Sequence, residues 1–305
     1  MYDLIIIGGS AAGASAGVYA ARRGLKYLII AKDLGGEVAL SGDVENWLGI
    51  KHTTGIELAA MFREHIESYK PELLEGYLAK ALTKDADGMF TVTTDDDKTY
   101  RAKAVILATG AHSRLLGVPG EDTYRLKGVS YCTVCDGPIF KDKRTVTIGG
   151  GNSALESALM LADIASEVTV LNKNAAFKGE ASLIEKVANN PKITVIYNAM
   201  TTAITGDGSF AKGLTYRGAD GAEHTLEMDG AFVHIGQIPN SQIVPADCQK
   251  DAFGYVTIGL DGATSCTGLF AAGDVTSSAH KQIIIAAGQG ASAALSAVQY
   301  INRLA

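Results

Sequence analysis

Apolar runs that end on small-residue turns recur along the chain and predict alternating strands and helices. Residues 2–7 form a short apolar strand, and residues 27–30 form another after a stretch of small residues at helical spacing. The turn after the first strand consists of Gly8, Gly9, Ser10, Ala11, Ala12 and Gly13. This order predicts a βαβ unit in which a helix N-terminus faces a pyrophosphate.

The same order returns about half a chain later. Residues 144–148 are an apolar strand, Gly149-Gly150-Gly151 is the turn, and 154–162 and 167–171 read as a helix and a returning strand. A lone glycine motif is weak evidence, but one placed between a strand and a helix is stronger. The repetition therefore predicts two dinucleotide sites.

The remaining elements follow from the same patterns. We expect a helix over residues 56–69 and a small-residue helix from Lys281 that follows Gly273-Asp274, with an Ala/Ser-rich helix over 291–298. A charged hairpin tip over 95–98 separates two β-rich runs. The expected strands are 90–94, 99–102, 104–107, 193–197, 213–217, 232–236 and 268–272.

The first turn departs from the usual pattern at two places. Ser10 occupies the middle glycine position, where its hydroxyl could hydrogen-bond a phosphate. At the end of the second strand Lys32 is a poor partner for a ribose diol, so Asp33 is the candidate.

Composition narrows the class of protein. The chain has 305 residues, 47% of them hydrophobic and 20% charged, with a formal net charge of -6. This balance is typical of a globular protein and argues against a nucleic-acid partner. We expect no membrane span and no signal peptide, and hence a cytoplasmic protein.

Cys132 and Cys135, separated by two residues, are the candidate redox centre. A thiolate there can attack a disulfide, and Asp136 could carry the proton. Half of a zinc site is the alternative, but it needs further ligands, and Cys248 and Cys266 are neither close in sequence nor paired. We read those two cysteines as bystanders and expect no metal. His234, inside an apolar strand, reads as a core histidine.

Together these residues resemble the low-molecular-weight thioredoxin reductase family. They are still more similar to the C-terminal, thioredoxin-reductase-like part of the alkyl hydroperoxide reductase flavoprotein subunit, to which the run over residues 281–286 points. The matching segments are 8–13, 35–37, 45–47, 108–110, 131–137, 149–156, 236, 239–240, 273–274 and 281–290.

The resemblance implies an α/β fold with two Rossmann-like dinucleotide-binding domains (three-layer ββα), in class II of the pyridine nucleotide-disulfide oxidoreductases. It implies an FAD-binding domain made of residues 1–114 and 243–305, an inserted NAD(P)H-binding domain over 115–242 that carries the CxxC, and a homodimer. The implied activity passes electrons from a nicotinamide through FAD to the disulfide and on to a redoxin. That partner is a thioredoxin, a glutaredoxin-like protein or a peroxiredoxin system.

The resemblance also implies roles for single residues. Cys132 would attack the partner, Cys135 would resolve the mixed disulfide, and Asp136 would be the general acid. FAD would be held by Gly8, Ser10, Gly13, Asn46, Asp274 and Gln282, and the nicotinamide by Gly149, Gly151, Asn152, Ser153 and Gly236. The cofactor-binding set also includes Gly9, Ala11, Ala12, Lys32, Asp33, Gly36, Glu37, Thr109, Gly110, Glu156, Asn172, Lys173, Gly273, Lys281 and Ile283.

The electron donor is open between three classes. An arginine-rich stretch that would pair with a 2′-phosphate is replaced by residues 172–178, in which lysines are weaker substitutes. Asn172, not an acid, stands at the strand end, although an amide can still bond a ribose hydroxyl. We expect NADH over NADPH, with ferredoxin or a deazaflavin as the alternative donor. A binding protein without turnover is the alternative from another class.

Overall fold

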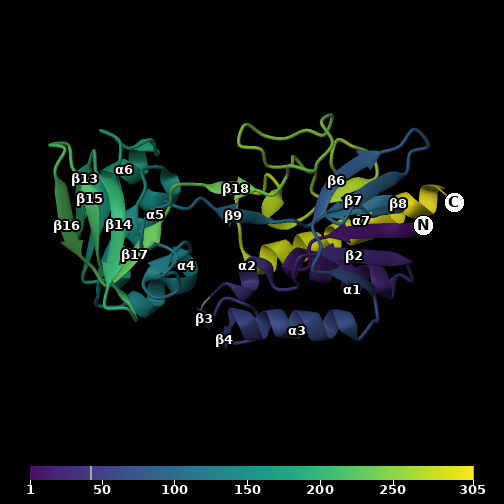
Figure 1. The fold of residues 1–305 in the computed structure, drawn as a ribbon, viewed down its shortest axis with the longest axis horizontal. Helices are drawn as coiled ribbons and strands as arrows, with labels where there is room; N and C mark the ends of the chain where they lie inside the picture. Colours follow the sequence, from purple (N-terminus) through teal and green to yellow (C-terminus); the bar gives the residue numbers. More distant parts are fainter. Residues whose placement is uncertain (42, 305) are drawn as a thin grey trace. The chain divides into compact units, whose positions relative to one another are not determined.

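The structure, a computed structural model, describes residues 1–41 and 43–304. The chain folds into two compact units (Figure 1). Unit 1 comprises Met1–His112 and the chain from Ile238 on, and unit 2 comprises Ser113–Gln237. The chain passes between the units in two short strands that pair with each other, β9 (Ala111–Ser113) and β18 (Gln237–Pro239).

Unit 1 is built on a seven-stranded sheet with the path β5-β2-β1-β8-β7-β6, to which β19 adds by pairing with β8. The strands β5, β2, β1, β8 and β19 are parallel, and β6-β7-β8 form an antiparallel meander. A two-stranded pair, β3–β4, stands apart. The bounds are β1 Tyr2–Ile7, β2 Tyr27–Ala31, β3 Asp43–Val44, β4 Thr53–Thr54, β5 Glu72–Glu75, β6 Ala79–Lys84, β7 Phe90–Thr94, β8 Thr99–Leu107 and β19 Leu269–Ala271.

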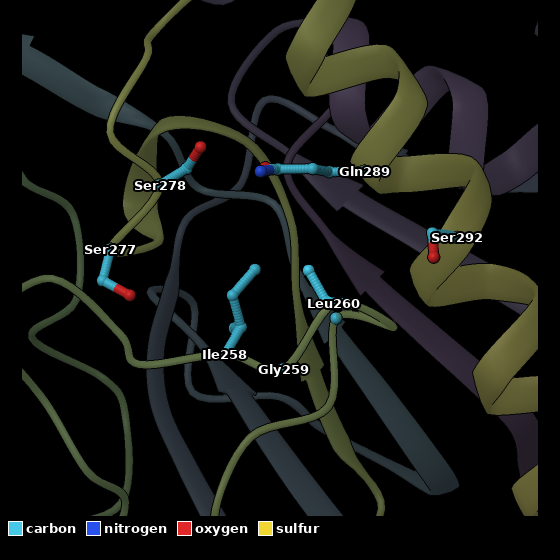
Figure 2. Close-up of a pocket in the computed structure, with 8 residues that line it drawn as sticks. Ile258, Gly259, Leu260, Ser277, Ser278, Gln289 and Ser292 are labelled. Atoms are coloured by element: carbon cyan, nitrogen blue, oxygen red, sulfur yellow. The ribbon is translucent and has the colours of Figure 1, made fainter.

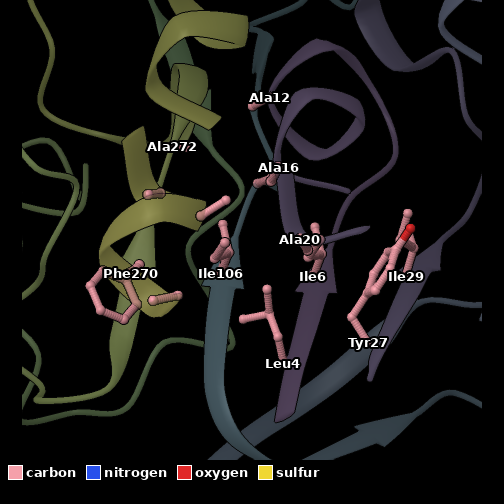
Figure 3. Close-up of a cluster of buried hydrophobic side chains, with 14 of the residues drawn as sticks. Leu4, Ile6, Ala12, Ala16, Ala20, Tyr27, Ile29, Ile106, Phe270 and Ala272 are labelled. Carbon is pink, nitrogen blue, oxygen red and sulfur yellow. The ribbon is translucent and has the colours of Figure 1, made fainter. Parts of the chain in front are cut away.

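Small residues let two helices of unit 1 approach closely. The helix α1 (Ala11–Arg22) packs against α7 (Ile283–Leu304), and Ala16, Ala293 and Ala297 in this region are fully buried. Figure 3 shows the alanines of α1 above the apolar side chains of the central strands. The other helical segments are α2 Gly36–Ala39, α3 Gly55–Glu67 and the 3₁₀ turn η2 Gly273–Val275.

In length and mean hydropathy (1.2), α7 could cross a membrane. Core helices of soluble proteins can have the same length and hydropathy. The small-residue face of α7 lies in the core cluster of unit 1. The helix is one continuous element, where the sequence suggested separate segments around residues 281–288 and 291–298.

Unit 2 contains a five-stranded parallel sheet of order β10-β17-β11-β12-β13 and a three-stranded antiparallel sheet, β14-β15-β16. Its strands are β10 Val129–Ser130, β11 Arg144–Ile148, β12 Glu167–Asn172, β13 Ile193–Tyr197, β14 Met200–Gly206, β15 Ala211–Arg217, β16 Glu223–Glu227 and β17 Gly230–Val233. Its helical segments are α4 Thr133–Asp136, η1 Gly137–Phe140, α5 Asn152–Ile164 and α6 Ala181–Ala188.

The strands and helices that carry the glycine turns agree with the sequence prediction to within about two residues. Three differences are local. The expected runs at 99–102 and 104–107 are one strand, because β8 continues from the hairpin into the parallel sheet. The helix expected at 154–162 begins at Asn152, directly after the glycine turn. The strand expected at 232–236 ends at Val233.

Candidate functional site

The turn after β1 lies where unit 1 would bind a dinucleotide. It follows the carboxyl end of β1, whose neighbours β2 and β8 extend the sheet in opposite directions, the usual ligand position in such sheets. A Cβ on Gly8 would lie 2.1 Å from the carbonyl oxygen of Ala108, and one on Gly13 would lie 1.9 Å from that of Gly8. Gly8 also has a φ of 112°. Only glycine fits at these two positions.

Side chains around this turn hold the loop that follows β2. The Ser10 hydroxyl donates to the carbonyl of Gly35 (2.7 Å), so its proton is directed to the protein and not to a phosphate. Asp33 accepts from the backbone N–H groups of Gly35 (3.0 Å) and Gly36 (2.5 Å) through one carboxylate oxygen. Lys32 is exposed.

The first turn of α1 retains N–H groups that could bind an anion. Ser10 is the N-cap residue, yet its side chain makes no capping hydrogen bond. Ala11, Ala12 and Gly13, which open the helix, carry no side chain larger than a methyl group. The turn therefore fits the pyrophosphate of FAD.

Two further hydrogen-bonded pairs connect predicted cofactor residues with distant parts of unit 1. The Asn46 amide donates to the Gln282 side chain (3.1 Å) across 236 positions of sequence. The Thr109 hydroxyl donates to the carbonyl of Asn240 (2.6 Å), and the Asn240 amide donates back to the carbonyl of Thr109 (2.8 Å). Gly110, with a φ of 68°, accepts from the backbone N–H of Asn240. Asn240 was not among the predicted residues, although its segment was part of the resemblance.

The segment after β19 places Gly273 and Asp274 near the start of α7. The backbone N–H of Gly273 donates to Gln289 (2.8 Å), and burial raises the pKa of Asp274 above its ordinary value, with Lys281 acting in the opposite sense. Lys281 donates to the carbonyl of Thr276 (2.5 Å), lies 4.4 Å from the ring centroid of Tyr255 and has its pKa lowered by burial. This cation is therefore held by its neighbours in unit 1.

The other predicted positions of unit 1 lie on the same elements. Glu37 is on α2, and Ile283 opens α7 and packs against the cluster formed by Ala11, Val38 and Leu58. Gly9 is closed in by Leu34, whose side chain would lie 2.6 Å from an added Cβ.

A separate hollow in unit 1 carries none of the predicted cofactor residues. It has a volume of about 240 Å³ and is lined by residues of the 258–262 turn, by Ser277 and Ser278, and by Gln289 and Ser292 of α7 (Figure 2). Gln289 connects it with the Gly273 turn through its hydrogen bond. Cys248 and Cys266 are buried free thiols in the core of this unit.

Unit 2 repeats the turn at the end of β11. Gly149 has a φ of 151°, and a Cβ there would lie 2.2 Å from the carbonyl oxygen of His234. Gly151 is the N-cap of α5 and has no side chain to cap it. Asn152 donates to Glu180 (3.0 Å) and accepts from the Glu180 backbone (2.8 Å). Ser153, Glu156 and Gly236 are exposed around this turn.

Asn172, at the end of β12, is engaged by its own loop. The side chain is 1% exposed, accepts from the backbone N–H of Asn174 (3.0 Å) and donates to the carbonyl of Ala176 (3.0 Å). These bonds direct both ends of the amide into the 172–176 loop. Lys173 beside it is exposed.

The two cysteines of the CxxC are bonded to each other in unit 2. Cys132 is the N-cap of the short helix α4, and the backbone N–H of Cys135 points at its sulfur (3.2 Å). That N–H would stabilise a thiolate at Cys132 after reduction. No group of three potential metal ligands occurs among residues 1–41 and 43–304.

Asp136 is held by a residue that the sequence reasoning missed. The buried Ser130 hydroxyl lies 2.6 Å from a carboxylate oxygen of Asp136, and Ser130 also accepts from the backbone N–H of Cys132 (3.1 Å). One serine thus orients both Asp136 and the start of the turn from Cys132 to Cys135, which we call the redox turn. Ser130 lies two residues before Cys132, and only that proximity signals its role.

Thr133, inside the CxxC, is also anchored. Its hydroxyl oxygen lies 2.6 Å from the Ser157 hydroxyl of α5 and 2.8 Å from Nε2 of His234, which follows β17. Burial lowers the pKa of His234 to about 4, so the imidazole is neutral at physiological pH. The histidine is partnered by Thr133, as expected for a core histidine, and that partner belongs to the redox turn.

Both units carry a glycine turn of the dinucleotide-binding type, and unit 2 also carries a bonded CxxC. Residues 2–290 match the family model described as pyridine nucleotide-disulphide oxidoreductase. The chain belongs to this family.

The relatives and structural neighbours of the chain have the names of oxidoreductases. The chain is 41% identical over 303 residues to a Bacillus subtilis protein named NADH dehydrogenase, covering 99% of this chain and 59% of the relative. It is 39% identical over 305 residues to the F subunit of alkyl hydroperoxide reductase from Escherichia coli, covering 99% and 58%. The crystal structure of thioredoxin reductase from Streptococcus pyogenes superposes with a TM-score of 0.93 at 34% identity, covering 99% of both chains.

The chain thus spans little more than half the length of these two curated relatives. The family match and the thioredoxin reductase neighbour establish the fold and the family of the chain. The family also implies FAD and a nicotinamide cofactor. The predicted family and fold class are therefore confirmed.

Proposed function

We propose that this protein is a thioredoxin-reductase-like enzyme that passes electrons from NADH through FAD to the Cys132–Cys135 disulfide and on to a small redoxin. The observation that carries the proposal is a bonded CxxC on a unit that also has its own nucleotide-type turn at Gly149. FAD, when bound, supplies the two-electron link between the nicotinamide and the disulfide.

The chain's own residues account for the exchange with the partner. Cys132 is the attacking thiolate, because the N–H of Cys135 faces its sulfur. Its attack on the partner's disulfide forms a mixed disulfide and releases one partner thiolate. Cys135 then attacks Cys132, which re-forms the internal disulfide and releases the second partner thiolate. Asp136, held by Ser130, gives the proton that a departing thiolate takes up.

In unit 1 we assign the turn at Gly8–Gly13 and the Asn46–Gln282 pair to FAD, and in unit 2 the turn from Gly149 to Ser153 to the nicotinamide. NADH is favoured because residues 172–178 offer no arginine for a 2′-phosphate, and relatives of the chain are named NADH dehydrogenase. The partner assignment is supported by the relatives named as the F subunit of alkyl hydroperoxide reductase and by the thioredoxin reductase fold.

A different donor, ferredoxin or a reduced deazaflavin, is the second candidate. Asn172 supports it, because the amide that a ribose hydroxyl would need is already bonded within its loop. We further propose a homodimer, to be checked by light scattering. A cytoplasmic location suits a dithiol that must stay reducible.

Anaerobic titration of the purified yellow protein tests the function. NADH should bleach the flavin at lower concentration than NADPH, and a labelling reagent should then count two additional thiols. Bleaching by reduced ferredoxin or deazaflavin alone would select the second donor. Flavin bleaching without new thiols would overturn the disulfide as electron acceptor.

A further inference from the structure

The middle of the CxxC is tied to two other elements of unit 2 through a single hydroxyl. Thr133 is 5% exposed, and its Oγ1 lies within hydrogen-bond distance of both Ser157 and His234. A hydroxyl has one proton, so it donates to one neighbour and accepts from the other. Either histidine tautomer allows an unbroken chain of hydrogen bonds.

The two anchors of Thr133 sit on rigid parts of the unit. Ser157 is 4% exposed and lies on the face of α5 that also buries Ala154, Ala158 and Leu161. His234 directly follows β17, the strand between β10 and β11, and its carbonyl oxygen closes over Gly149. The neutral imidazole can hold the hydroxyl without adding a charge near the sulfurs.

We propose that the chain Ser157–Thr133–His234 is a positioning network that keeps Cys132 and Cys135 within bonding reach of each other after reduction. The network thereby favours closure of the disulfide. The inference rests on the proposed function only in taking this pair as the redox-active one.

The physical reason is conformational entropy. When the disulfide opens, a free four-residue turn would gain backbone and side-chain freedom that must be lost again on closure. Thr133, fixed on both sides, limits that gain, so the two thiols remain at high effective concentration. The same restraint would speed the step in which Cys135 displaces the partner from Cys132.

The equilibrium with glutathione measures this effect directly. Two glutathione thiols reduce the protein disulfide, giving two cysteine thiols and one glutathione disulfide, so atoms and electrons balance. The full-length protein is equilibrated at a series of glutathione ratios and its thiols are trapped with iodoacetamide. Mass spectrometry of the peptide with Cys132 and Cys135 then gives the equilibrium constant.

Thr133→Val and Thr133→Ser form the matched pair. Valine keeps the shape of threonine but removes the hydroxyl. We expect the equilibrium to shift about fivefold to tenfold toward the dithiol, because the opened turn then gains conformational freedom that it must lose again on closure. Serine keeps the hydroxyl and should stay within about twofold of the wild type, because the bonds to Ser157 and His234 remain. Equal shifts in both variants, or no shift in a folded Thr133→Val protein, would overturn the proposal.

A second pair of variants, at His234, tests the network independently of Thr133. His234→Gln retains a side-chain amide able to hydrogen-bond Thr133, whereas His234→Leu does not. We expect only the leucine variant to shift the equilibrium toward the dithiol, and equal equilibria in the two would contradict the network. If Thr133 and His234 had a purely structural role, the variants would have a lower melting temperature and an unchanged equilibrium constant with glutathione.

The glutathione measurement needs neither a nicotinamide nor a redoxin. Failure of flavin reduction by every donor would therefore remove the proposed function and leave this equilibrium measurable. Conversely, if the enzyme is active and the Thr133→Val variant has an unchanged glutathione equilibrium, the proposed function stands and the proposed network is wrong.

Discussion

Each unit has a glycine turn of the same kind, but the helix that follows the turn packs differently in the two units. Gly8 and Gly149 both have a left-handed φ, and an added Cβ at either would strike a backbone carbonyl at the end of a neighbouring strand, that of Ala108 or His234. Beyond the turn they differ. In unit 1, α1 packs on α7 through alanine and glycine, whereas in unit 2, α5 presents a buried serine to Thr133.

In the proposed function, unit 1 holds FAD, and unit 2 holds the nicotinamide and carries the cysteine pair. Close backbone packing in unit 1 leaves little room for polar side chains between the helices, and a rigid scaffold suits a cofactor that stays bound. Unit 2 places buried hydroxyls around the sulfurs, where they restrain the turn without adding charge. Four predictions test this contrast, in order of decreasing effect.

Cys135→Ser should remove the chemistry of unit 2 and leave unit 1 intact. We expect disulfide reduction to fall about a thousandfold or more, because the mixed disulfide at Cys132 cannot be resolved. Flavin content should equal that of the wild type. Cys248→Ala, a change in the core of unit 1, is the control and should retain turnover, measured with a redoxin substrate and NADH.

Gly290→Ala should break the packing of unit 1. An added Cβ would lie 2.0 Å from the carbonyl oxygen of Ala12, a backbone atom that cannot move aside as a flexible side chain can. We expect the free energy of unfolding to fall by about 3 kcal/mol. Gly288→Ala, two positions earlier in α7, meets nothing within 4 Å and should be neutral or stabilising by up to about 1 kcal/mol. Similar urea unfolding curves for the two variants would contradict the close packing.

His234 should make unit 2 sensitive to acid. Its pKa falls from 6.5 to about 4 on folding, so between these values the unfolded state binds more protons and stability decreases as the pH falls. The full loss is about 3 kcal/mol, at about 1.36 kcal/mol per pKa unit. His234→Gln should lack this part of the acid sensitivity, whereas His224→Gln, a change at a more accessible histidine, should keep it. Melting temperatures between pH 4 and 8 give the comparison.

Asp274→Asn should have the smallest effect. Burial raises the pKa of this acid above 3.8, so the folded state binds more protons and the carboxylate destabilises the fold above that pH. With both proteins free of flavin, the variant should therefore have a slightly higher melting temperature than the wild type at pH 7. The two melting temperatures should converge below pH 4. A wild type that melts higher at pH 7 would show that Lys281 outweighs the burial of Asp274.

Much of the fold could be predicted because its signals are local. The glycine turns, the parallel strands beside them and the CxxC each occupy a short stretch with its own periodicity. Strands β14 and β16 were missed, because their residues are mostly half-exposed or exposed and give a weak apolar pattern. Helix α6 was missed although Leu183, Ile184 and Val187 stand at helical spacing, because the segment is only eight residues long.

The candidate site was only partly predictable. Position in the motif and residue type marked Ser10 and Asn172 as cofactor contacts. In the structure the Ser10 hydroxyl donates to Gly35 and the Asn172 amide bonds within its own loop. Ser130 and Ser157 look ordinary in the sequence, although both support the redox turn.

The sequence by itself determined where strands, turns and the sulfur pair would occur, since those depend on residues a few positions apart. The tertiary structure decided which polar groups are engaged and by what, since those partners lie up to 236 positions apart along the chain. A hydrogen bond requires atoms within about 3 Å, and only packing of the sheets and helices brings remote residues that close.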